Sequence, residues 1–370
     1  MSLVVQDVLT ATIDEVDAKA YTIPTDGTEA DGTLTWDSVT LVVVHVTAGG
    51  KRGMGYTYAD AGAAATVNTL IAEAAKGLNA MDVPACWAAM RQAIRNNAES
   101  GIAAMAVAAV DNALWDLKAK LLNLPLAAML GQVRKTVPVY GSGGFISYSM
   151  DRLRGELEDW VIEGISGVKM KIGLDIRDEN QRVRTAREAI GSDTELFVDA
   201  NGAFDRKAAL AMADILARYR VSWFEEPVHH SDLEGLRLLR DRCPAGMELA
   251  AGEYGFNLWY FRRMAEAGAI DVLQADATRC GITGFLQAAA LCEAFNLPMS
   301  AHGAPSLHLH PCCAASPIRH MEYFHDHVRI EHMLFDGVQK LTQGTLQPDL
   351  SRPGLGLELK IADAERYQVR

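Results

Sequence analysis

Residues 166–173 read SGVKMKIG, a short apolar segment between glycines that carries two lysines. In a β-strand alternate side chains share a face, so Lys169 and Lys171 would point one way while Val168 and Met170 point the other. An edge strand uses lysine in the same way to block aggregation. The rest of the chain decides between an exposed edge and a buried interior.

Short apolar segments of this kind recur from about residue 136, separated by segments of helical length. In order they are TVPVYG (136–141), GVKMKIG (167–173), ELFVDAN (195–201), VSWFEEP (221–227), MELAAGE (247–253), IDVLQAD (270–276), LPMSAH (297–302) and RHMEYF (319–324). Strands and helices that alternate predict parallel βαβ units. Eight such strands predict a closed barrel, whose chemistry lies where strands end and loops begin.

The residues before this alternation predict a smaller α+β unit. Antiparallel strands are expected at 4–13, 38–50 and 53–58. The polar, turn-rich segment 21–36 indicates a mobile loop. Helices are expected at about 61–80, 83–98 and 102–122.

The C-terminal segment RPGLGLELK (352–360) breaks the alternation and is expected to return to the first unit. The chain is therefore expected to divide into an N-terminal capping domain over 1–130, a catalytic barrel over 131–350 and a returning segment over 351–370.

The amino-acid composition limits which binding partners and which cellular compartment are expected. The chain has 47 acidic and 35 basic residues and a net charge of −12, which argues against nucleic acid and anionic membranes. No secretory signal is expected at the N-terminus, and no stretch approaches the roughly 18 apolar residues of a membrane span. The six cysteines lack CxxC spacing, as is typical of reduced cysteines in a cytoplasmic protein.

A polar side chain ends each expected strand from the second onward, where a buried strand should avoid it. These residues follow one another at the length of one βα repeat, and they are Lys169 and Lys171, Asp199, Glu225, Glu253, Asp276, His302 and Glu322. The spacing places one functional group at the end of each strand, around a common centre.

Three of these residues, Asp199, Glu225 and Glu253, are acids on consecutive strands. Carboxylates held close together repel one another unless a cation neutralises them, and hard oxygen ligands suit Mg²⁺. Asp276 and His302 end the next two strands, where a carboxylate can orient an imidazole and make it a stronger base.

A lysine beside a second ammonium in an apolar barrel loses proton affinity, which favours Lys171 as a base. Lys171 and His302 are expected to approach a substrate from opposite sides. An acid and a base on opposite faces of one carbon can exchange its proton or drive an elimination.

The chain resembles the enolase superfamily, and within it the mandelate racemase subgroup. The motifs that carry the resemblance are AVAAVDNALWDLKA (106–119), KMK, VDAN, FEEP, GE, DATRCG, SAH and HME. The resemblance covers essentially the whole chain and implies a (β/α)7β barrel with an α+β cap completed by the C-terminal segment. One departure is Ile282, which follows Gly281 where the subgroup usually has a second glycine.

The resemblance also implies roles. Asp199, Glu225 and Glu253 look like Mg²⁺ ligands, and Lys171 and His302 like opposing acid/base catalysts. Lys169 would lower the pKa of Lys171 and touch the substrate carboxylate. Asp276 would orient His302, and a protonated Glu322 would hydrogen-bond the substrate carboxylate.

The implied reaction removes the α-proton of a carboxylate substrate to give an enediolate. Dehydration of a sugar acid to a 2-keto-3-deoxy acid is favoured. Racemisation, epimerisation or cycloisomerisation of an α-hydroxy acid or an acid-sugar lactone is the alternative. Hydroxyl contacts are expected from a polar cap loop, through Thr25, Asp26, Thr28, Glu29, Asp31 and Thr33. A homo-oligomer is expected.

Two rival hypotheses assign the chain a different kind of metal site or a different class of function. The stretch SAHGAPSLHLHPCC offers a structural zinc site through His308, His310, Cys312 and Cys313, while HDH at 325–327 is expected to be solvated. A non-catalytic sugar-acid binding protein would keep the acids and lose a base, whereas Lys171, Asp276 and His302 are all present.

Overall fold

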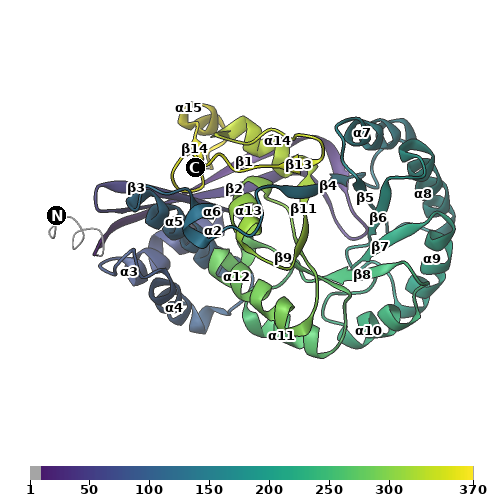
Figure 1. Cartoon of the computed structure of the whole chain (residues 1–370), viewed down its shortest axis with the longest axis horizontal. Helices are drawn as coiled ribbons and strands as arrows, with labels where there is room; N and C mark the ends of the chain where they lie inside the picture. Colours follow the sequence, from purple (N-terminus) through teal and green to yellow (C-terminus); the bar gives the residue numbers. More distant parts are fainter. Residues whose placement is uncertain (1–9, 370) are drawn as a thin grey trace.

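Eight parallel strands close into a barrel in this computed structural model, which describes residues 10–369 (Figure 1). The barrel strands are β4 (Val137–Gly143), β5 (Gly167–Lys171), β6 (Glu195–Asp199), β7 (Val221–Glu225), β8 (Glu248–Ala251), β9 (Val272–Ala275), β10 (Met299–Ala301) and β11 (Ile318–Phe324). Each strand pairs with the next in sequence, and β11 pairs back with β4. The expected eight strands and their closure into a barrel are confirmed.

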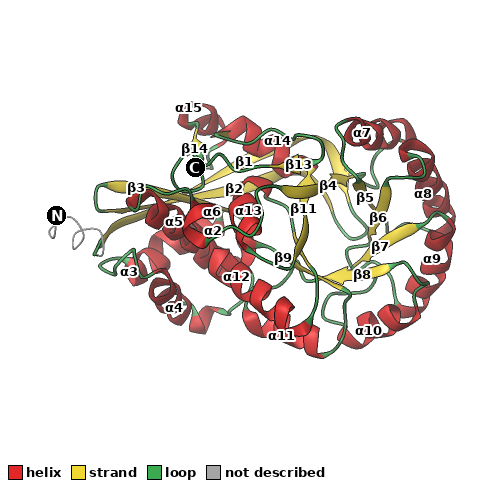
Figure 2. Ribbon diagram, in the orientation of Figure 1, coloured by secondary structure: helices red, strands yellow, loops and turns green. Residues whose placement is uncertain are grey.

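Seven helices connect successive barrel strands and form the outer layer of the barrel (Figure 2). They are α7 (Met150–Ile162), α8 (Ile176–Ile190), α9 (Arg206–Arg218), α10 (Leu233–Arg242), α11 (Leu258–Glu266), α12 (Ala277–Phe295) and α13 (Pro305–Ala314). A side-chain oxygen of Ser, Asp or Asn caps the N-terminus of each of the first six. These caps satisfy backbone N–H groups that the first helical turn leaves free.

The cap consists of a three-stranded antiparallel sheet and helices packed on it. Its strands are β1 (Ile13–Ala30), β2 (Thr35–Ala48) and β3 (Lys51–Tyr58). Its helical segments are α2 (Gly62–Thr66), the π-helical η1 (Val67–Ile71), α3 (Ala72–Ala75), α4 (Val83–Ala93), the 3-10 turn η2 (Arg95–Asn97), α5 (Ile102–Leu121) and α6 (Leu126–Leu130). The helices expected in this region are confirmed, whereas the strand expected at 4–13 lies mostly outside the described residues.

The prediction of a mobile loop at 21–36 is wrong. β1 continues to Ala30 and β2 begins at Thr35, with one irregularity in register between Pro24 and Glu29. Cross-strand pairing outweighs the local turn signals, and the Thr22 and Thr40 hydroxyls, for example, lie 2.9 Å apart. Only the short turn around Asp31 remains as a loop.

Helix α5 joins the cap to the barrel through buried polar side chains. It lies between the cap sheet and α12 of the barrel (Figure 2). Asp111 accepts hydrogen bonds from the backbone N–H and the hydroxyl of Thr283, and Asn112 Oδ1 accepts one from the Ile282 N–H. The chain turns at Gly281 with φ 69°, and a Cβ at that position would lie 2.5 Å from Asp111 Oδ2. The DATRCGI segment therefore bends against α5.

The C-terminal residues run beside the cap (Figure 1). After α14 (His325–Leu334), short β12 (Phe335–Asp336) pairs with β14 (Glu358–Leu359), and β13 (Thr345–Leu346) pairs with β4. α15 (Ile361–Ala364) and η3 (Glu365–Tyr367) complete the chain. Asp116 of α5 accepts hydrogen bonds from the Met54 N–H of β3 and from the Leu355 N–H of the tail. One buried carboxylate thus links three distant segments.

Close contact between β3 and α5 leads to the first prediction, for Gly55→Ala. A Cβ on Gly55 would lie 2.3 Å from the Ala113 N and 2.4 Å from the Ala109 O, both of them backbone atoms of α5. Overpacking of this kind costs about 1–3 kcal/mol, so the midpoint of thermal unfolding should fall. Gly155→Ala in α7 is the control, because its Cβ meets nothing within 4 Å and helix propensity favours alanine. Equal midpoints for the two variants would contradict the prediction.

Candidate active site

Three carboxylates meet at the C-terminal ends of neighbouring barrel strands. Asp199 ends β6, Glu225 ends β7 and Glu253 follows β8. All three are buried, and each offers an oxygen within 4.8 Å of the others. Burial, and then the nearby Asp199 charge, raise the pKa of Glu225 to about 8. These crowded hard-oxygen donors fit a divalent cation such as Mg²⁺.

The two lysines of the opening segment point into the barrel, as the strand alternation predicts. Lys169 is fully buried; its Nζ lies 2.7 Å and 2.8 Å from the two Glu225 carboxylate oxygens and 2.8 Å from Glu322 Oε1. The Nζ of Lys171 donates to Asp199 Oδ2. The interpretation of KMK as an exposed edge is therefore excluded.

The prediction that the pKa of Lys171 is lowered is wrong for this arrangement of side chains. Burial lowers its pKa and Lys169 lowers it further, as expected, but Asp199 and the other carboxylates outweigh both, so the pKa lies above its ordinary value. The sequence shows the second ammonium, but it does not show how closely the counterions surround it.

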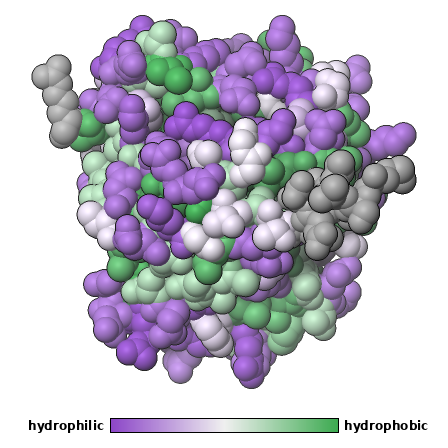
Figure 3. All heavy atoms as spheres, turned by 90° about the vertical axis from the view of Figure 1, so that its left-hand side faces the viewer, coloured by the Kyte–Doolittle hydropathy of each residue, from purple (hydrophilic) through white to green (hydrophobic). Residues whose placement is uncertain are grey.

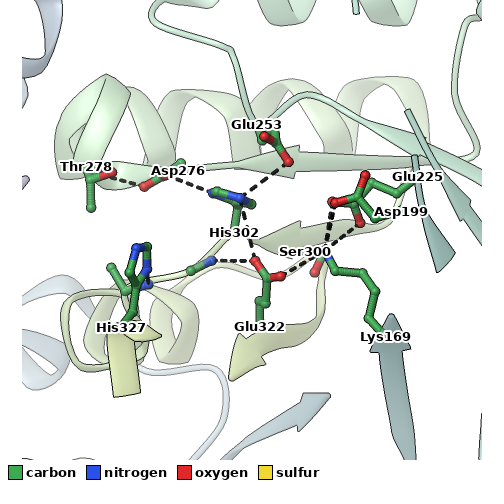
Figure 4. A network of polar contacts seen from close by, with 12 residues as sticks. Lys169, Asp199, Glu225, Glu253, Asp276, Thr278, Ser300, His302, Glu322 and His327 are labelled. Carbon is green, nitrogen blue, oxygen red and sulfur yellow. Dashed lines mark hydrogen bonds and ion pairs between the residues drawn. The ribbon is translucent and has the colours of Figure 1, made fainter. Parts of the chain in front are cut away.

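His302 lies at the centre of the cluster (Figure 4). Its Nδ1 is 2.9 Å from Asp276 Oδ2, while its Nε2 is 3.3 Å from Glu253 Oε2 and 3.7 Å from Glu322 Oε2. Burial alone would lower the pKa of His302, but the Glu253, Glu322 and Asp276 carboxylates raise it to about 9. The structure brings Asp276 and His302 together, with the imidazole charged at neutral pH.

Glu322, on the last barrel strand, is the last of the site residues. The prediction that Glu322 is protonated is wrong in this arrangement. Its Oε2 accepts the Gly303 N–H at 2.8 Å, and its Oε1 pairs with Lys169. Burial would raise the pKa of Glu322, yet the Lys169 and His302 charges hold it below its ordinary value. Glu322 is therefore a carboxylate here.

These groups open into one pocket of about 190 Å³ between the barrel and the cap. It is lined by Lys171, Asn201, Glu253, Tyr254, Asp276, Thr278, Arg279, His302, Glu322, Phe324 and His327 of the barrel half and by Asp31, Trp36 and Tyr58 of the cap. Of the six cap-loop residues expected to contact hydroxyls, Asp31 lines this pocket. Asp26 instead pairs with Arg152 and His325, and buried Glu29 accepts from the Trp36 indole.

Sequence reasoning missed His327. The HDH segment was expected to be solvated, but Asp326 and His327 are buried, and the ring of His327 stacks on Tyr58 with centroids 3.6 Å apart. The signal that could have found His327 is its position. HDH directly follows the eighth strand, at the end of the barrel where the strands from the second onward carry site residues.

The zinc hypothesis is not supported by the side-chain geometry. His308 Nε2 accepts the Ala277 N–H at 2.7 Å and its Nδ1 lies 2.8 Å from the Gly303 carbonyl oxygen. His310 Nδ1 accepts the Ala127 N–H at 3.1 Å. Both histidines lie in α13 and are thus engaged by backbone groups of other segments. Among the described residues no metal-ligating group includes them with Cys312 or Cys313.

Family models match both halves of the chain. Residues 29–131 match the mandelate racemase/muconate lactonizing enzyme N-terminal domain, and residues 152–364 match the enolase C-terminal domain-like family. Within residues 10–369, no helix has the length and apolar character to cross a membrane.

Three relatives are similar over nearly the whole chain. A 3,6-anhydro-alpha-L-galactonate cycloisomerase of Streptomyces coelicolor is 30% identical, covering 96% of this chain and 99% of that protein. A mandelate racemase/muconate lactonizing enzyme-like protein from Rubrobacter xylanophilus is 51% identical with a TM-score of 0.95, covering 97% and 100%. An L-talarate dehydratase from Polaromonas sp. JS666, solved with Mg and L-glucarate, is 28% identical with a TM-score of 0.88, covering 98% of each chain. The chain belongs to the mandelate racemase/muconate lactonizing enzyme family of the enolase superfamily.

Proposed function

We propose that the protein removes the α-proton of a sugar acid with the help of Mg²⁺ and expels the β-hydroxyl as water, giving a 2-keto-3-deoxy acid. The observation that carries this proposal is the presence of an amine and an imidazole in one pocket, beside three clustered carboxylates. Lys171 comes from β5 and His302 follows β10, so the two groups reach the pocket from well-separated strands.

In this proposal, Asp199, Glu225 and Glu253 hold the metal. Bound Mg²⁺ would supply Lewis-acid stabilisation of the negative charge that develops on the substrate carboxylate, and it would weaken the hold of Asp199 on the Lys171 proton. Lys169 also faces that charge, since its ammonium lies between Glu225 and Glu322.

The two acid/base groups have different starting states. His302 carries its proton at neutral pH, because its pKa is about 9, and it is therefore suited to protonate the departing β-hydroxyl. Asp276 fixes the ring by accepting from Nδ1, so Nε2 is the nitrogen that delivers the proton. Lys171 takes the α-proton as the neutral amine, after its ammonium has left Asp199 and lost its own proton to solvent.

Cycloisomerisation is the second candidate, favoured by the Streptomyces relative, which this chain matches over nearly its full length. The first step is the same, and the leaving group is a ring oxygen in place of a hydroxyl. A non-catalytic binding role is less well supported, because the pocket holds both groups that proton transfer needs.

The proposal extends to the organisation of the chain. Residues 1–130 with 351–370 act as the cap and residues 131–350 as the catalytic barrel. The protein works in the cytoplasm as a homo-oligomer, without nucleic acid or membrane as a partner. The net charge of −12 supports the last point, and a band of hydrophobic residues low on the cap face in Figure 3 supports assembly.

The function is tested with a panel of sugar acids and Mg²⁺, followed by 2-keto product and by deuterium incorporation at the α-carbon in D₂O. We expect keto product from at least one sugar acid. Exchange without keto product would favour racemisation, and a keto product with the same mass as a lactone or anhydro-acid substrate would favour cycloisomerisation. If neither product nor exchange occurs with any member of the panel, the proposal is wrong.

A further inference from the structure

The pocket has two walls of different chemistry. The metal ligand Glu253, the catalysts and the neighbouring Tyr254 and Arg279 form one wall. The second wall consists of Asp31, Trp36 and Tyr58 of the cap with Phe324 and His327 of the barrel end. A sugar acid whose carboxylate lies at the metal therefore presents its far end to this second wall.

His327 offers one fixed hydrogen-bond donor on the second wall. Its Nδ1 accepts the Ala304 N–H at 2.9 Å, so the ring is neutral and its proton is on Nε2. Burial, and then the His302 charge, lower the pKa of His327 to about 3, which agrees with that state. Stacking on Tyr58 and an edge contact with Phe324 at 4.8 Å hold the ring in place.

The Nε2 donor of His327 is unused among the described residues. Within residues 10–369, no group is hydrogen-bonded to Nε2, while the ring itself lines the pocket. A neutral N–H suits a hydroxyl or an ether oxygen of a sugar. It supplies no charge to hold an anion.

Asp31 adds an acceptor to the same wall. Its Oδ1 accepts from the Thr33 N–H, the Thr33 hydroxyl and the Leu34 N–H, which fixes the turn between β1 and β2. Oδ2 has no hydrogen-bond partner within the described part of the chain. A carboxylate in this place accepts hydroxyls and repels a second carboxylate.

The cations nearest to this wall are already paired. Arg152 lies 2.7 Å from Asp26, and Arg329 lies 3.0 Å from Asp326 and donates to the Pro24 carbonyl oxygen. His325 bridges Asp26 and Glu156. No free positive charge on these side chains remains for a distal anion.

Besides Lys171 and His302, which the proposed reaction uses, Arg279 is the cation that lines the described pocket, and it lies on the wall of the metal ligand Glu253. Its guanidinium lies over the Tyr254 ring at 4.4 Å, and its Nε is 3.7 Å from Asp276 Oδ2. Asp276 and the Tyr254 ring thus hold Arg279 beside the metal ligands.

We propose that the pocket selects sugar acids with a single carboxylate, whose distal hydroxyls are bound by His327 Nε2–H and Asp31, and that it rejects the matched dicarboxylates. The inference rests on the proposed function, because it places the reacting carboxylate at the metal. It separates this chain from the Polaromonas relative, whose structure holds L-glucarate, a dicarboxylate.

The test compares matched pairs that differ only at the far carbon: D-gluconate with D-glucarate, and D-galactonate with galactarate. We expect kcat/KM for the preferred monoacid to exceed that of its diacid by at least about 10²-fold, since a site built for hydroxyls leaves a second carboxylate unpaired. Equal or better turnover of a diacid overturns the inference and leaves the proposed function standing. Absence of both product and α-deuterium exchange with every acid removes the proposed function and the inference with it.

Substitutions of Asp31 and His327 test whether the second wall determines the selectivity for monoacids. Asp31→Asn keeps the turn acceptor and removes the charge, so the monoacid-to-diacid ratio should fall about tenfold, mainly through a gain with the diacid. His327→Phe keeps the stacked ring but removes both the Nε2 donor and the acceptor of the Ala304 N–H, and it should raise KM for the monoacid at least about tenfold. His327→Gln, which keeps a donor, should recover part of that loss. Unchanged KM and ratio in folded variants would overturn the assignment.

Discussion

Lys171→Ala should lower kcat at least about 10²-fold, the low end of the effect of losing a general acid or base. The Lys171 ammonium is bound to Asp199 and opens into the pocket, so the substitution removes the group placed to take the α-proton. Steady-state kinetics with the preferred sugar acid measure the loss. Near-normal turnover would reject the assignment of Lys171 as a catalyst.

His302→Asn is the matched variant, because it removes the opposing group and retains polarity beside Asp276. It should also lower kcat at least about 10²-fold, but it should retain α-deuterium exchange in D₂O, since Lys171 can still take and return the proton. Lys171→Ala should lose exchange and turnover together. The opposite pattern would reverse the roles of the two groups. A thermal midpoint close to that of the wild type shows that each variant is folded.

Removal of divalent metal should abolish activity, and Mg²⁺ should restore it. Asp199, Glu225 and Glu253 crowd their oxygens within 4.8 Å, and several kcal/mol of stabilisation of the transition state depend on a cation there. The measurement is turnover after thorough chelation and after stepwise return of Mg²⁺. The fold should survive chelation, because Lys169 and Lys171 neutralise two of the carboxylates directly.

Asp199→Asn provides the control for this experiment. It removes one charge from the metal site and one partner from Lys171, so the Mg²⁺ concentration that restores half of the activity should rise at least about tenfold. Activity that resists chelation would remove the metal from the mechanism. Stoichiometric zinc that is lost on replacing Cys312 and Cys313 would revive the hypothesis based on His308, His310, Cys312 and Cys313.

The barrel could be predicted from the sequence because its signal is local and repeated. Each strand is a short apolar run, each linker has helical length, and the polar strand ends recur at one interval. The tip of the β1–β2 hairpin, residues 21–36, had no such signal. Its residues are polar and turn-rich, and they became strand because Thr22 and its neighbours pair across to β2, an interaction between positions that no local window contains.

The positions of the site residues were predicted from the sequence, but their protonation states were not. Strand periodicity alone aims Lys169, Lys171 and the acids at one centre. The protonation states of Lys171 and Glu322 depend on which carboxylate pairs with which ammonium, within a few ångströms and across different strands. The role of His327 was not predicted, because it depends on a hydrogen bond from the backbone N–H of Ala304 that fixes the tautomer of the ring. No residue pattern in the sequence indicates such a bond.

The hydrogen bonds of Asp116 have a consequence for the order of events during synthesis on the ribosome. Met54, one of its two backbone partners, precedes Asp116 by 62 residues, whereas Leu355 follows it by 239 residues. Domains generally fold as units from the N-terminus onward during synthesis, and Met54 and Lys120, whose Nζ lies 2.9 Å from Asp116, are available to the carboxylate early. The Leu355 N–H is added only after all eight barrel strands, so the cap is completed by residues made later than the barrel.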